Sequence, residues 1–183
     1  MNNNYIYWKN RTTNWINDRT HNPGVSLEYV NYINKYSNND SLCLEIGCGT
    51  GHYLSCINSK YIYGIDFMND FINYADKIKP NNCSVYTIDI SKQKFMYDVD
   101  LIYSCVVLQH ISSGIENAIN NICSLNAKDI IIFECTDNSF KNNSYLFCHN
   151  YDEYFNKNNY SLYHKKLLSN NITYVLHYKK NII

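Results

Sequence analysis

The sequence predicts an α/β fold, with a doubly wound, mostly parallel sheet, helices on both faces and a C-terminal antiparallel strand pair. Short, continuously apolar runs alternate with longer amphipathic runs from residue 42 to residue 134. Strands of this kind are buried on both faces, which is typical of parallel sheets covered by helices. Right-handed crossovers between such strands place the helices on both faces. After residue 150, two strand-like runs are joined by a short loop, which favours antiparallel pairing.

The first 40 residues form a lead-in to this pattern. The sequence His-Asn-Pro-Gly at 21–24 predicts a turn that divides the lead-in in two. After the turn, apolar side chains recur at helical spacing, and Ser26 can cap the helix that they predict. The side chains with this spacing are Tyr29, Tyr32, Ile33 and Tyr36.

The elements that follow are predicted in order along the chain. Strands are expected at 42–46, 61–66, 84–88, 101–105 and 129–134. Helices are expected over about 51–58, through 71–75 with an end before Pro80, and over 114–124. Residues 151–155 predict a short helix, and 160–164 and 172–178 predict the antiparallel pair.

Length and charge narrow the class of protein. A length of 183 residues suits one domain, so we expect residues 1–183 to form a single domain in which 1–40 is a lead-in or lid. The 16 basic and 16 acidic side chains balance, so the chain lacks the basic surplus that nucleic-acid binders use. A local basic patch stays open as an alternative, although edge strands often carry lysine to prevent pairing. The lysines near the C-terminus are Lys165, Lys166, Lys179 and Lys180.

The cysteines and the N-terminus indicate a compartment. The eight cysteines include no C-x-x-C pair, which argues against a metal finger or a redox motif, and we expect no metal. Cys43, Cys105 and Cys135 lie in or beside apolar runs, as buried free thiols do. The N-terminus has no apolar signal segment, and no run approaches transmembrane length. We therefore expect a reducing, cytoplasmic location without membrane contact.

A glycine-rich turn after the first strand is the strongest functional signal. Three of the six glycines, Gly47, Gly49 and Gly51, occupy alternate positions there, preceded by Glu45. Glycines at a strand-to-helix turn let the backbone approach a ligand closely, with helix N–H groups aimed at it. A glycine-rich turn can also be only a turn, but the order of strand, turn and helix favours a binding site.

The spacing of this turn distinguishes between nucleotide cofactors. The dinucleotide fingerprint needs glycine at position 52, where His52 stands, and a pyrophosphate gains nothing from Glu45. An acidic residue followed by G-x-G-x-G resembles the first motif of the class I, Rossmann-like, S-adenosylmethionine-dependent methyltransferases. The resemblance covers residues 41–135 by motif and extends to 183 by strand pattern. It implies S-adenosylmethionine as cofactor, bound at Glu45, Gly47, Cys48, Gly49 and Gly51.

Two further strand ends agree with this resemblance. Asp66 ends the second strand, where a carboxylate can accept hydrogen bonds from both ribose hydroxyls, in this cofactor or in NAD. By resemblance, Phe67 and Met68 pack near the adenine, although core packing is the alternative for both. Asp89 follows the third strand and would accept from the adenine amino group, with the N–H of Ile90 at a ring nitrogen. An Asp at such a place can also simply cap a turn.

The end of the fourth strand resembles the motif that passes beneath the methionine part of the cofactor, which places Cys105 there. His110 follows, and it could orient the acceptor or take its proton as a catalytic residue. A histidine that bonds locally at a helix start is the alternative. Displacement at an activated sulfonium needs mainly positioning and exclusion of water, so no nucleophile motif is required.

Other residues are candidates for the cover of the site and for its acceptor side. In similar proteins the lead-in often folds over the cofactor, where Arg11 could meet a carboxylate. Trp8 and Trp15 could wall the pocket or simply anchor the lead-in to the core. The acceptor-side candidates follow the fifth strand, at the edge where open α/β sheets bind ligands. They are Glu134, His149 and Tyr151.

We therefore expect methyl transfer to a small-molecule acceptor, because the charge is neutral and no recognition domain is appended. Methylation of RNA or protein is the first alternative, and a basic stripe beside the pocket would favour it. A non-catalytic binding partner with the same fold is the second, disfavoured by the intact glycines. An NAD-dependent oxidoreductase is the third, disfavoured by His52. The acceptor atom and the oligomeric state are open at this point.

Overall fold

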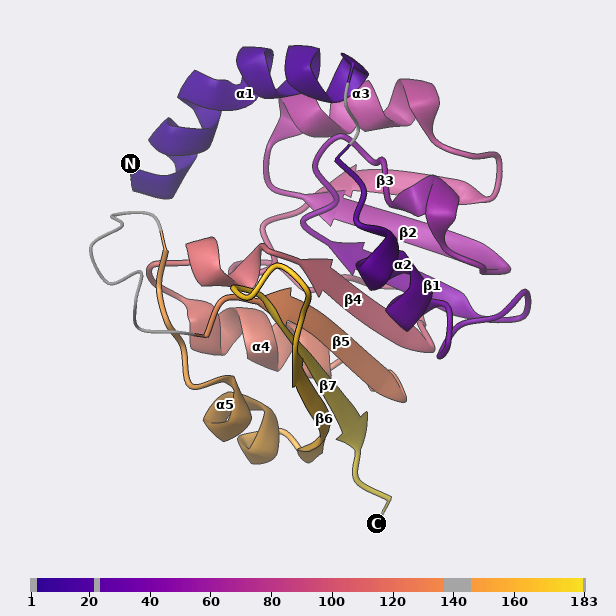
Figure 1. The fold of residues 1–183 in the computed structure, drawn as a ribbon, viewed down its shortest axis with the longest axis vertical. Coiled ribbons are helices and arrows are strands. Elements are labelled where there is room, and N and C mark those ends of the chain that lie inside the picture. Colours follow the sequence, from indigo (N-terminus) through magenta and orange to yellow (C-terminus); the bar gives the residue numbers. More distant parts are fainter. Residues whose placement is uncertain (1–2, 22–23, 137–145, 183) are drawn as a thin grey trace.

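The computed structural model describes residues 3–21, 24–136 and 146–182, and its centre is one seven-stranded sheet (Figure 1). The strand order is β3-β2-β1-β4-β5-β7-β6. Strands β1 to β5 pair in parallel, while β7 is antiparallel to both β5 and β6. The strands are β1 Leu42–Ile46, β2 Tyr61–Asp66, β3 Cys83–Thr87, β4 Leu101–Cys105, β5 Asp129–Glu134, β6 Tyr160–Leu167 and β7 Tyr174–Lys180. The expected fold class is confirmed.

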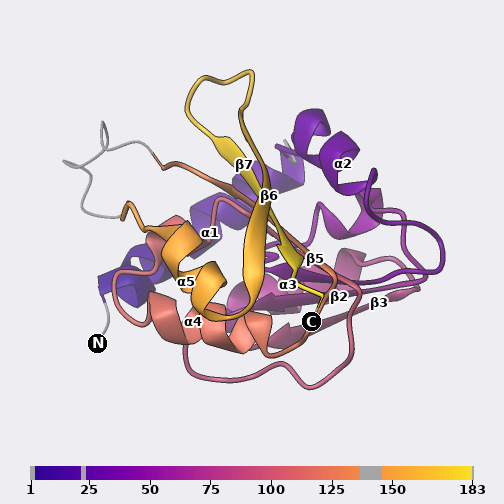
Figure 2. The same cartoon turned by 90° about the horizontal axis from the view of Figure 1, so that it is seen from below.

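Helices pack on both faces of this sheet (Figure 2). One cluster of buried side chains joins the sheet to α4 and α5, and includes Ile119 and Phe155. A second cluster lies on the opposite face and includes Val30 and Ile33 of α2 and Ile72 of α3. The helices are α1 Asn3–His21, α2 Leu27–Ile33, α3 Asn69–Ile78, α4 Ile115–Cys123 and α5 Tyr151–Lys157, with short 3₁₀ turns η1 Leu54–Cys56 and η2 Leu108–His110.

The helix expected over 51–58 is wrong, because only the three-residue turn η1 forms there. The side chain of Asn34 holds the end of this segment. Its amide nitrogen donates to the carbonyl of Cys56 at 3.0 Å, and its amide oxygen accepts from the N–H of Asn58 at 2.9 Å. Backbone groups that would continue a helix are therefore bonded to the segment after α2.

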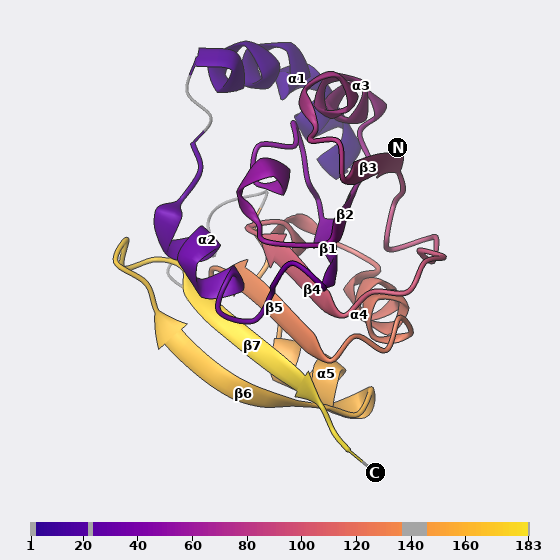
Figure 3. The same cartoon turned by 90° about the vertical axis from the view of Figure 1, so that its right-hand side faces the viewer.

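The lead-in differs from the expectation in its first half. Residues 3–21 form the long helix α1, which the sequence did not predict, and α1 lies beside α3 (Figure 3). The second half gives α2 as expected, although α2 ends at Ile33 rather than near Tyr36. The turn predicted at 21–24 falls partly outside the described residues.

The C-terminal strands form the end of the sheet farthest from α1 (Figure 3). β6 is the edge strand, and Lys165 and Lys166 are exposed on it, which agrees with the use of lysine on edge strands. None of the helices in the described part of the chain is long and apolar enough to cross a membrane.

Candidate functional site

Two adjoining cavities, of about 180 and 330 Å³, lie where the carboxyl ends of β1, β2 and β4 meet α1. This is the edge at which open α/β sheets bind ligands. Seven residues line both cavities, so the two spaces share a boundary. They are Trp8, Trp15, Gly47, Gly49, Cys105, Val106 and His110.

The three glycines of the turn after β1 have positive φ angles, +70° at Gly47, +52° at Gly49 and +82° at Gly51, but different surroundings. A Cβ atom on Gly47 would lie 2.4 Å from a methyl group of Val107, and one on Gly51 would lie 2.9 Å from the Cβ of Ala75. A Cβ atom on Gly49 would meet nothing within 4 Å. Gly47 and Gly51 therefore permit close packing, while Gly49 faces open space. Gly51 lines neither cavity.

The carboxylate of Asp66 joins the end of β2 to this glycine turn. One oxygen accepts from the N–H of Gly49 at 3.0 Å, and the other accepts from the N–H of Met68 at 2.8 Å. The side chain is 8% exposed and lines the first cavity. Burial raises the pKa of Asp66 to about 6, against the effect of these backbone donors. Phe67 lines the cavity as well, but the side chain of Met68 is buried in the core outside both cavities.

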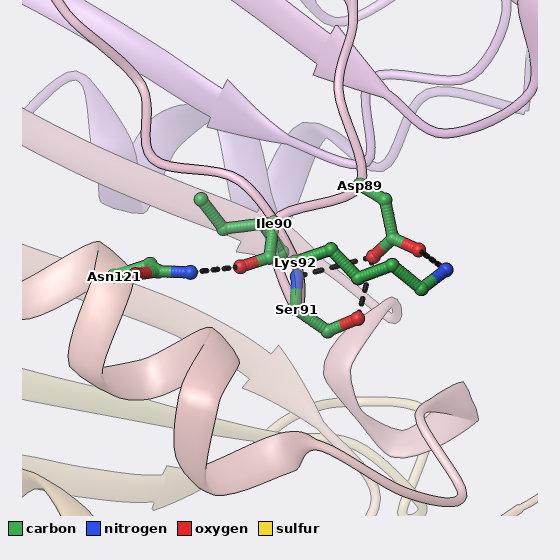
Figure 4. Close-up of polar contacts among 5 residues, drawn as sticks. All are labelled: Asp89, Ile90, Ser91, Lys92 and Asn121. Atoms are coloured by element: carbon green, nitrogen blue, oxygen red, sulfur yellow. Dashed lines mark hydrogen bonds and ion pairs between the residues drawn. The ribbon is translucent and has the colours of Figure 1, made fainter.

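Asp89 lines the first cavity and also caps the turn after β3 (Figure 4). One oxygen accepts from the N–H and the hydroxyl of Ser91 at 3.1 and 2.6 Å, and the other accepts from Lys92. Burial raises the pKa of Asp89, but the hydrogen bonds from Lys92 and Ser91 outweigh it and hold the pKa below its usual value. Asn121 of α4 donates to the carbonyl of Ile90 at 2.8 Å, which fixes this lining segment to α4.

Acidic and thiol side chains line the second cavity beneath the glycine turn. Glu45 is 1% exposed and accepts from the hydroxyl of Tyr103 at 3.1 Å. Burial raises the pKa of Glu45 well above its usual value. Burial also raises the pKa values of Cys48 and Cys105, so both thiols stay protonated at neutral pH and are poor nucleophiles.

The loop after β4 is strained and tightly held. Val106 has φ = +60°, which is rare for a β-branched residue, and its N–H donates to Phe133 at 2.8 Å. The next three N–H groups donate to the carboxylate of Glu134, those of Val107 and Gln109 at 3.1 Å and that of Leu108 at 2.8 Å. The loop thereby places His110, at the end of η2, against both cavities.

The acceptor-side interpretation of Glu134 is corrected by these contacts, because Glu134 is fully buried under the loop rather than facing a ligand. Burial raises the pKa of Glu134 to about 8. The other two candidates also lie outside the cavities. His149 contacts the carbonyl of Ile111 at 3.0 Å, and Tyr151 is buried in the core against α4.

Helix α1 supplies one wall of the site. Trp8 and Trp15 line both cavities, and Trp8 also packs edge-on against Phe71 of α3 at 6.3 Å. Both tryptophans thus wall the cavities, and Trp8 also anchors the helix. Arg11 is exposed, with its guanidinium 4.5 Å from the ring centre of Tyr7, so it does not meet a carboxylate of the site.

A further part of the second cavity was not identified from the sequence. Its wall includes Ser26 and Tyr29 near the start of α2, and Thr50, His52 and Tyr53 in and directly after the glycine turn. The second group lies in or next to the motif, so its position was available as a signal. The first group is distant in the sequence and carries no such signal. The Tyr53 hydroxyl accepts from the N–H of Ser26 at 2.9 Å and joins the two.

The acidic and basic side chains on the described walls of both cavities are three carboxyls, Glu45, Asp66 and Asp89, and two imidazoles, His52 and His110, with no lysine or arginine. Among the residues that the structure describes, no group of three or more His, Cys, Asp or Glu side chains could hold a metal ion. The walls are thus mainly apolar and aromatic, with carboxylates at two strand ends.

Residues 44–129 match the family model of a methyltransferase domain. Comparison with curated protein sequences finds no match. Among solved structures, the chain is similar to the N-methyltransferase NodS from Bradyrhizobium japonicum WM9 in complex with S-adenosyl-L-homocysteine. The TM-score is 0.77 at 16% identity, covering 99% of this chain and 100% of that one.

Two more solved structures share the arrangement. The magnesium protoporphyrin IX methyltransferase ChlM from Synechocystis PCC 6803 with bound SAM gives a TM-score of 0.73 at 14% identity, covering 99% of this chain and 98% of that one. A TehB-like SAM-dependent methyltransferase from Corynebacterium glutamicum ATCC 13032 Kitasato gives 0.72 at 19% identity, covering 96% and 99%. At these identities the likeness establishes a common fold.

Proposed function

We propose that this chain is a class I S-adenosylmethionine-dependent methyltransferase, and that it transfers a methyl group from S-adenosylmethionine to a small-molecule acceptor. One observation carries the proposal. Gly49, the middle glycine of the turn, faces open space in a cavity whose wall also holds Asp66 and Asp89, at the ends of neighbouring strands. A backbone without a side chain next to two carboxylates suits a nucleoside that lies against the turn.

The residues of the two cavities fit this cofactor. The carboxylate of Asp66 lines the first cavity, and its two oxygens each accept from a backbone N–H while a carboxylate offers about four acceptor sites, so it can also accept from the ribose. We assign Asp89, Ile90 and Phe67 to the adenine, since all three line the first cavity. We assign Glu45 to the amino group of the methionine part, because its carboxyl lines the second cavity. Further cofactor contacts are proposed at Gly47, Cys48, Gly49 and Cys105.

Two residues that the sequence resemblance assigns to the cofactor receive a different role in this proposal. Gly51 and Met68 lie outside the cavities, so we assign them to packing of the turn against α3 and of the core. The positive φ and the close approach to Ala75 explain why residue 51 is glycine without any ligand contact.

The cofactor supplies an activated methyl group, and the chain positions the reactants and excludes water from the site. Trp8 and Trp15 cover the boundary between the cavities and limit access of water. His110 reaches the same boundary and is our candidate for accepting the proton of an acceptor that arrives protonated. No covalent intermediate with the protein is needed, which fits the protonated state of Cys48 and Cys105.

The small-molecule acceptor is supported by charge and by position. No lysine or arginine lines the described cavity walls, and Lys165 and Lys166 lie on β6 at the far end of the sheet. An RNA substrate would need basic side chains beside the cavity to bind its phosphates. No disulfide joins the cysteines that the structure describes, which supports a reducing, cytoplasmic compartment. We also propose that residues 1–183 act as one domain, with α1 as its cover.

Ligand-dependent thermal unfolding tests this function. S-adenosylmethionine and S-adenosylhomocysteine are expected to raise the unfolding midpoint in a concentration-dependent way, because they bind only the native state. NAD, which shares the adenosine but not the methionine part, is the control and is expected to have no effect. A shift with NAD alone would contradict the proposal.

A further inference from the structure

Three aromatic side chains meet at the boundary between the two cavities. The ring of Trp8 lies 5.4 Å from the ring of His110, with the planes at 88°. It lies 5.6 Å from the ring of Trp15, with the planes at 85°. Trp8 is therefore perpendicular to both neighbours, and all three rings line both cavities. We call Trp8, Trp15 and His110 together the aromatic corner. It presents ring faces and ring edges at right angles to one another.

The aromatic corner is held from two sides. Trp8 packs against Phe71 of α3, and Phe71 is buried. On the other side, the N–H of His110 donates to the carbonyl of Val107 at 2.9 Å, and Glu134 fixes the backbone of the residues between them. Rings held in place before a ligand arrives lose little freedom on binding, which favours a specific site.

The cofactor assignment leaves this corner without a ligand. Asp66, Asp89 and Glu45 provide the polar contacts of the proposed cofactor site, and none of these side chains belongs to the corner. We assign the adenosine part of the cofactor to the first cavity and its methionine part to the second. Since the corner lines both cavities, a second molecule bound there would lie next to the cofactor. The corner is therefore the place that an acceptor would occupy.

The walls around the corner select by charge and shape. Without lysine or arginine on the described walls, a carboxylate or phosphate on the acceptor would have no permanently charged partner. Burying an unpaired charge is costly. Aromatic walls instead favour planar rings, which stack on one ring and meet the edge of another.

We propose that Trp8, Trp15 and His110 form the acceptor subsite, and that the acceptor is a planar aromatic molecule without an anionic group that carries a hydroxyl group beside His110. This rests on the proposed function. The acceptor oxygen gives its proton to a ring nitrogen of His110 and forms a bond to the methyl carbon. The electron pair of the broken carbon–sulfur bond stays on sulfur, and His110 returns the proton to water.

Calorimetric titration of the full chain, saturated with S-adenosylhomocysteine, tests this with three probes of one skeleton. They are 2-naphthol, the saturated and non-planar decahydro-2-naphthol, and 6-hydroxy-2-naphthoic acid. We expect 2-naphthol to bind at least about tenfold more tightly than the other two. Equal binding of the saturated probe, tighter binding of the acid, or no binding of 2-naphthol would overturn the subsite. Failure of S-adenosylhomocysteine itself to bind would instead overturn the proposed function.

Variants locate the binding on the corner. Trp15→Leu is expected to weaken 2-naphthol about five- to tenfold, with Trp15→Phe retaining most of the affinity. Tyr7→Leu is the matched control, because Tyr7 contacts Trp8 on the same helix at 5.2 Å but lines neither cavity, and it is expected to change nothing. A Trp15→Leu protein that loses affinity for S-adenosylhomocysteine but not for 2-naphthol would show that the ring serves the cofactor, which overturns the proposal.

Discussion

Replacing Gly49 by alanine is expected to remove cofactor binding at a small cost in stability. The φ of +52° costs an L-residue about 1–2 kcal/mol. No steric clash adds to this, because the new Cβ meets nothing within 4 Å. For a chain of this size such a loss lowers the unfolding midpoint by roughly 2–8 °C, so most of the protein stays folded at 25 °C.

The binding side of this prediction follows from the direction of the missing side chain. The Cβ would enter the space that we assign to the cofactor, next to the carboxylate of Asp66, which already accepts from the N–H of Gly49. We expect at least about a tenfold loss of affinity for Gly49→Ala, which corresponds to about 1.4 kcal/mol. Gly49→Val, with two further methyl groups, is expected to abolish binding.

Two other glycines provide matched controls in the same assay, which is calorimetry with S-adenosylhomocysteine beside circular dichroism. Gly114 also has a positive φ, +84°, and lines neither cavity, and its Cβ would make only an ordinary contact of 3.5 Å with Ser91, on the wall of the first cavity. Gly114→Ala is thus expected to lower the free energy of unfolding, because of its positive φ, without lowering the affinity for S-adenosylhomocysteine. Gly51→Ala adds a 2.9 Å approach to Ala75, and is expected to lose more stability while its folded fraction still binds.

Two results would refute this reasoning. A folded Gly49→Ala protein that binds with normal affinity would mean that the ligand does not lie against the turn. A Gly114→Ala protein with the same loss of affinity as Gly49→Ala would mean that backbone strain, and not occupied space, causes the effect.

Three more predictions concern ionisable groups. Asp66→Ala should weaken cofactor binding by about 1–3 kcal/mol with the fold retained. In the wild type, binding should weaken as the pH falls through about 6, where Asp66 gains its proton, and Asp66→Asn should flatten this dependence in calorimetry. For Glu134, burial raises the folded pKa to about 8, so its stabilising contribution is present below the unfolded value of 4.5 and is lost as the pH rises through 8. Glu134→Gln should therefore flatten the fall of the unfolding free energy between pH 6.5 and 8 in denaturant titrations, and an unchanged slope would contradict the assignment. His110→Asn should slow methylation of a phenolic acceptor about 100-fold at neutral pH with little change in KM, and the rate should recover at high pH, where the phenol ionises unaided. A loss that is equal at every pH would remove His110 as the proton acceptor.

The sequence by itself determined where the strands of the parallel sheet lie along the chain. Strands at 42–46, 61–66, 101–105 and 129–134 occur where they were predicted, because a strand buried on both faces requires a continuous apolar run that few other structures use. The sites at Asp66 and Asp89 follow from the same pattern, because the carboxyl ends of parallel strands meet at one edge. The glycine turn was readable because a positive φ at alternate positions favours glycine strongly.

Features that depend on contacts between distant segments were decided only by the tertiary structure. The expected helix at 51–58 is replaced by η1, which goes no further than Cys56, where Asn34 bonds the backbone, and no local pattern carries that information. Glu134 was expected to face the acceptor, but its carboxylate accepts from three N–H groups of the loop after β4.

Tertiary contacts also distinguish the glycines of the turn from one another and place α1 at the site. Gly49 and Gly51 look alike in sequence and in φ, but Ala75 of α3 stands against one of them and open space against the other. Trp8 is placed by Phe71 and His110, both more than 60 residues away in the chain. Local propensity sets the preferred conformation of a segment, whereas packing between segments supplies the neighbours that give a side chain its role.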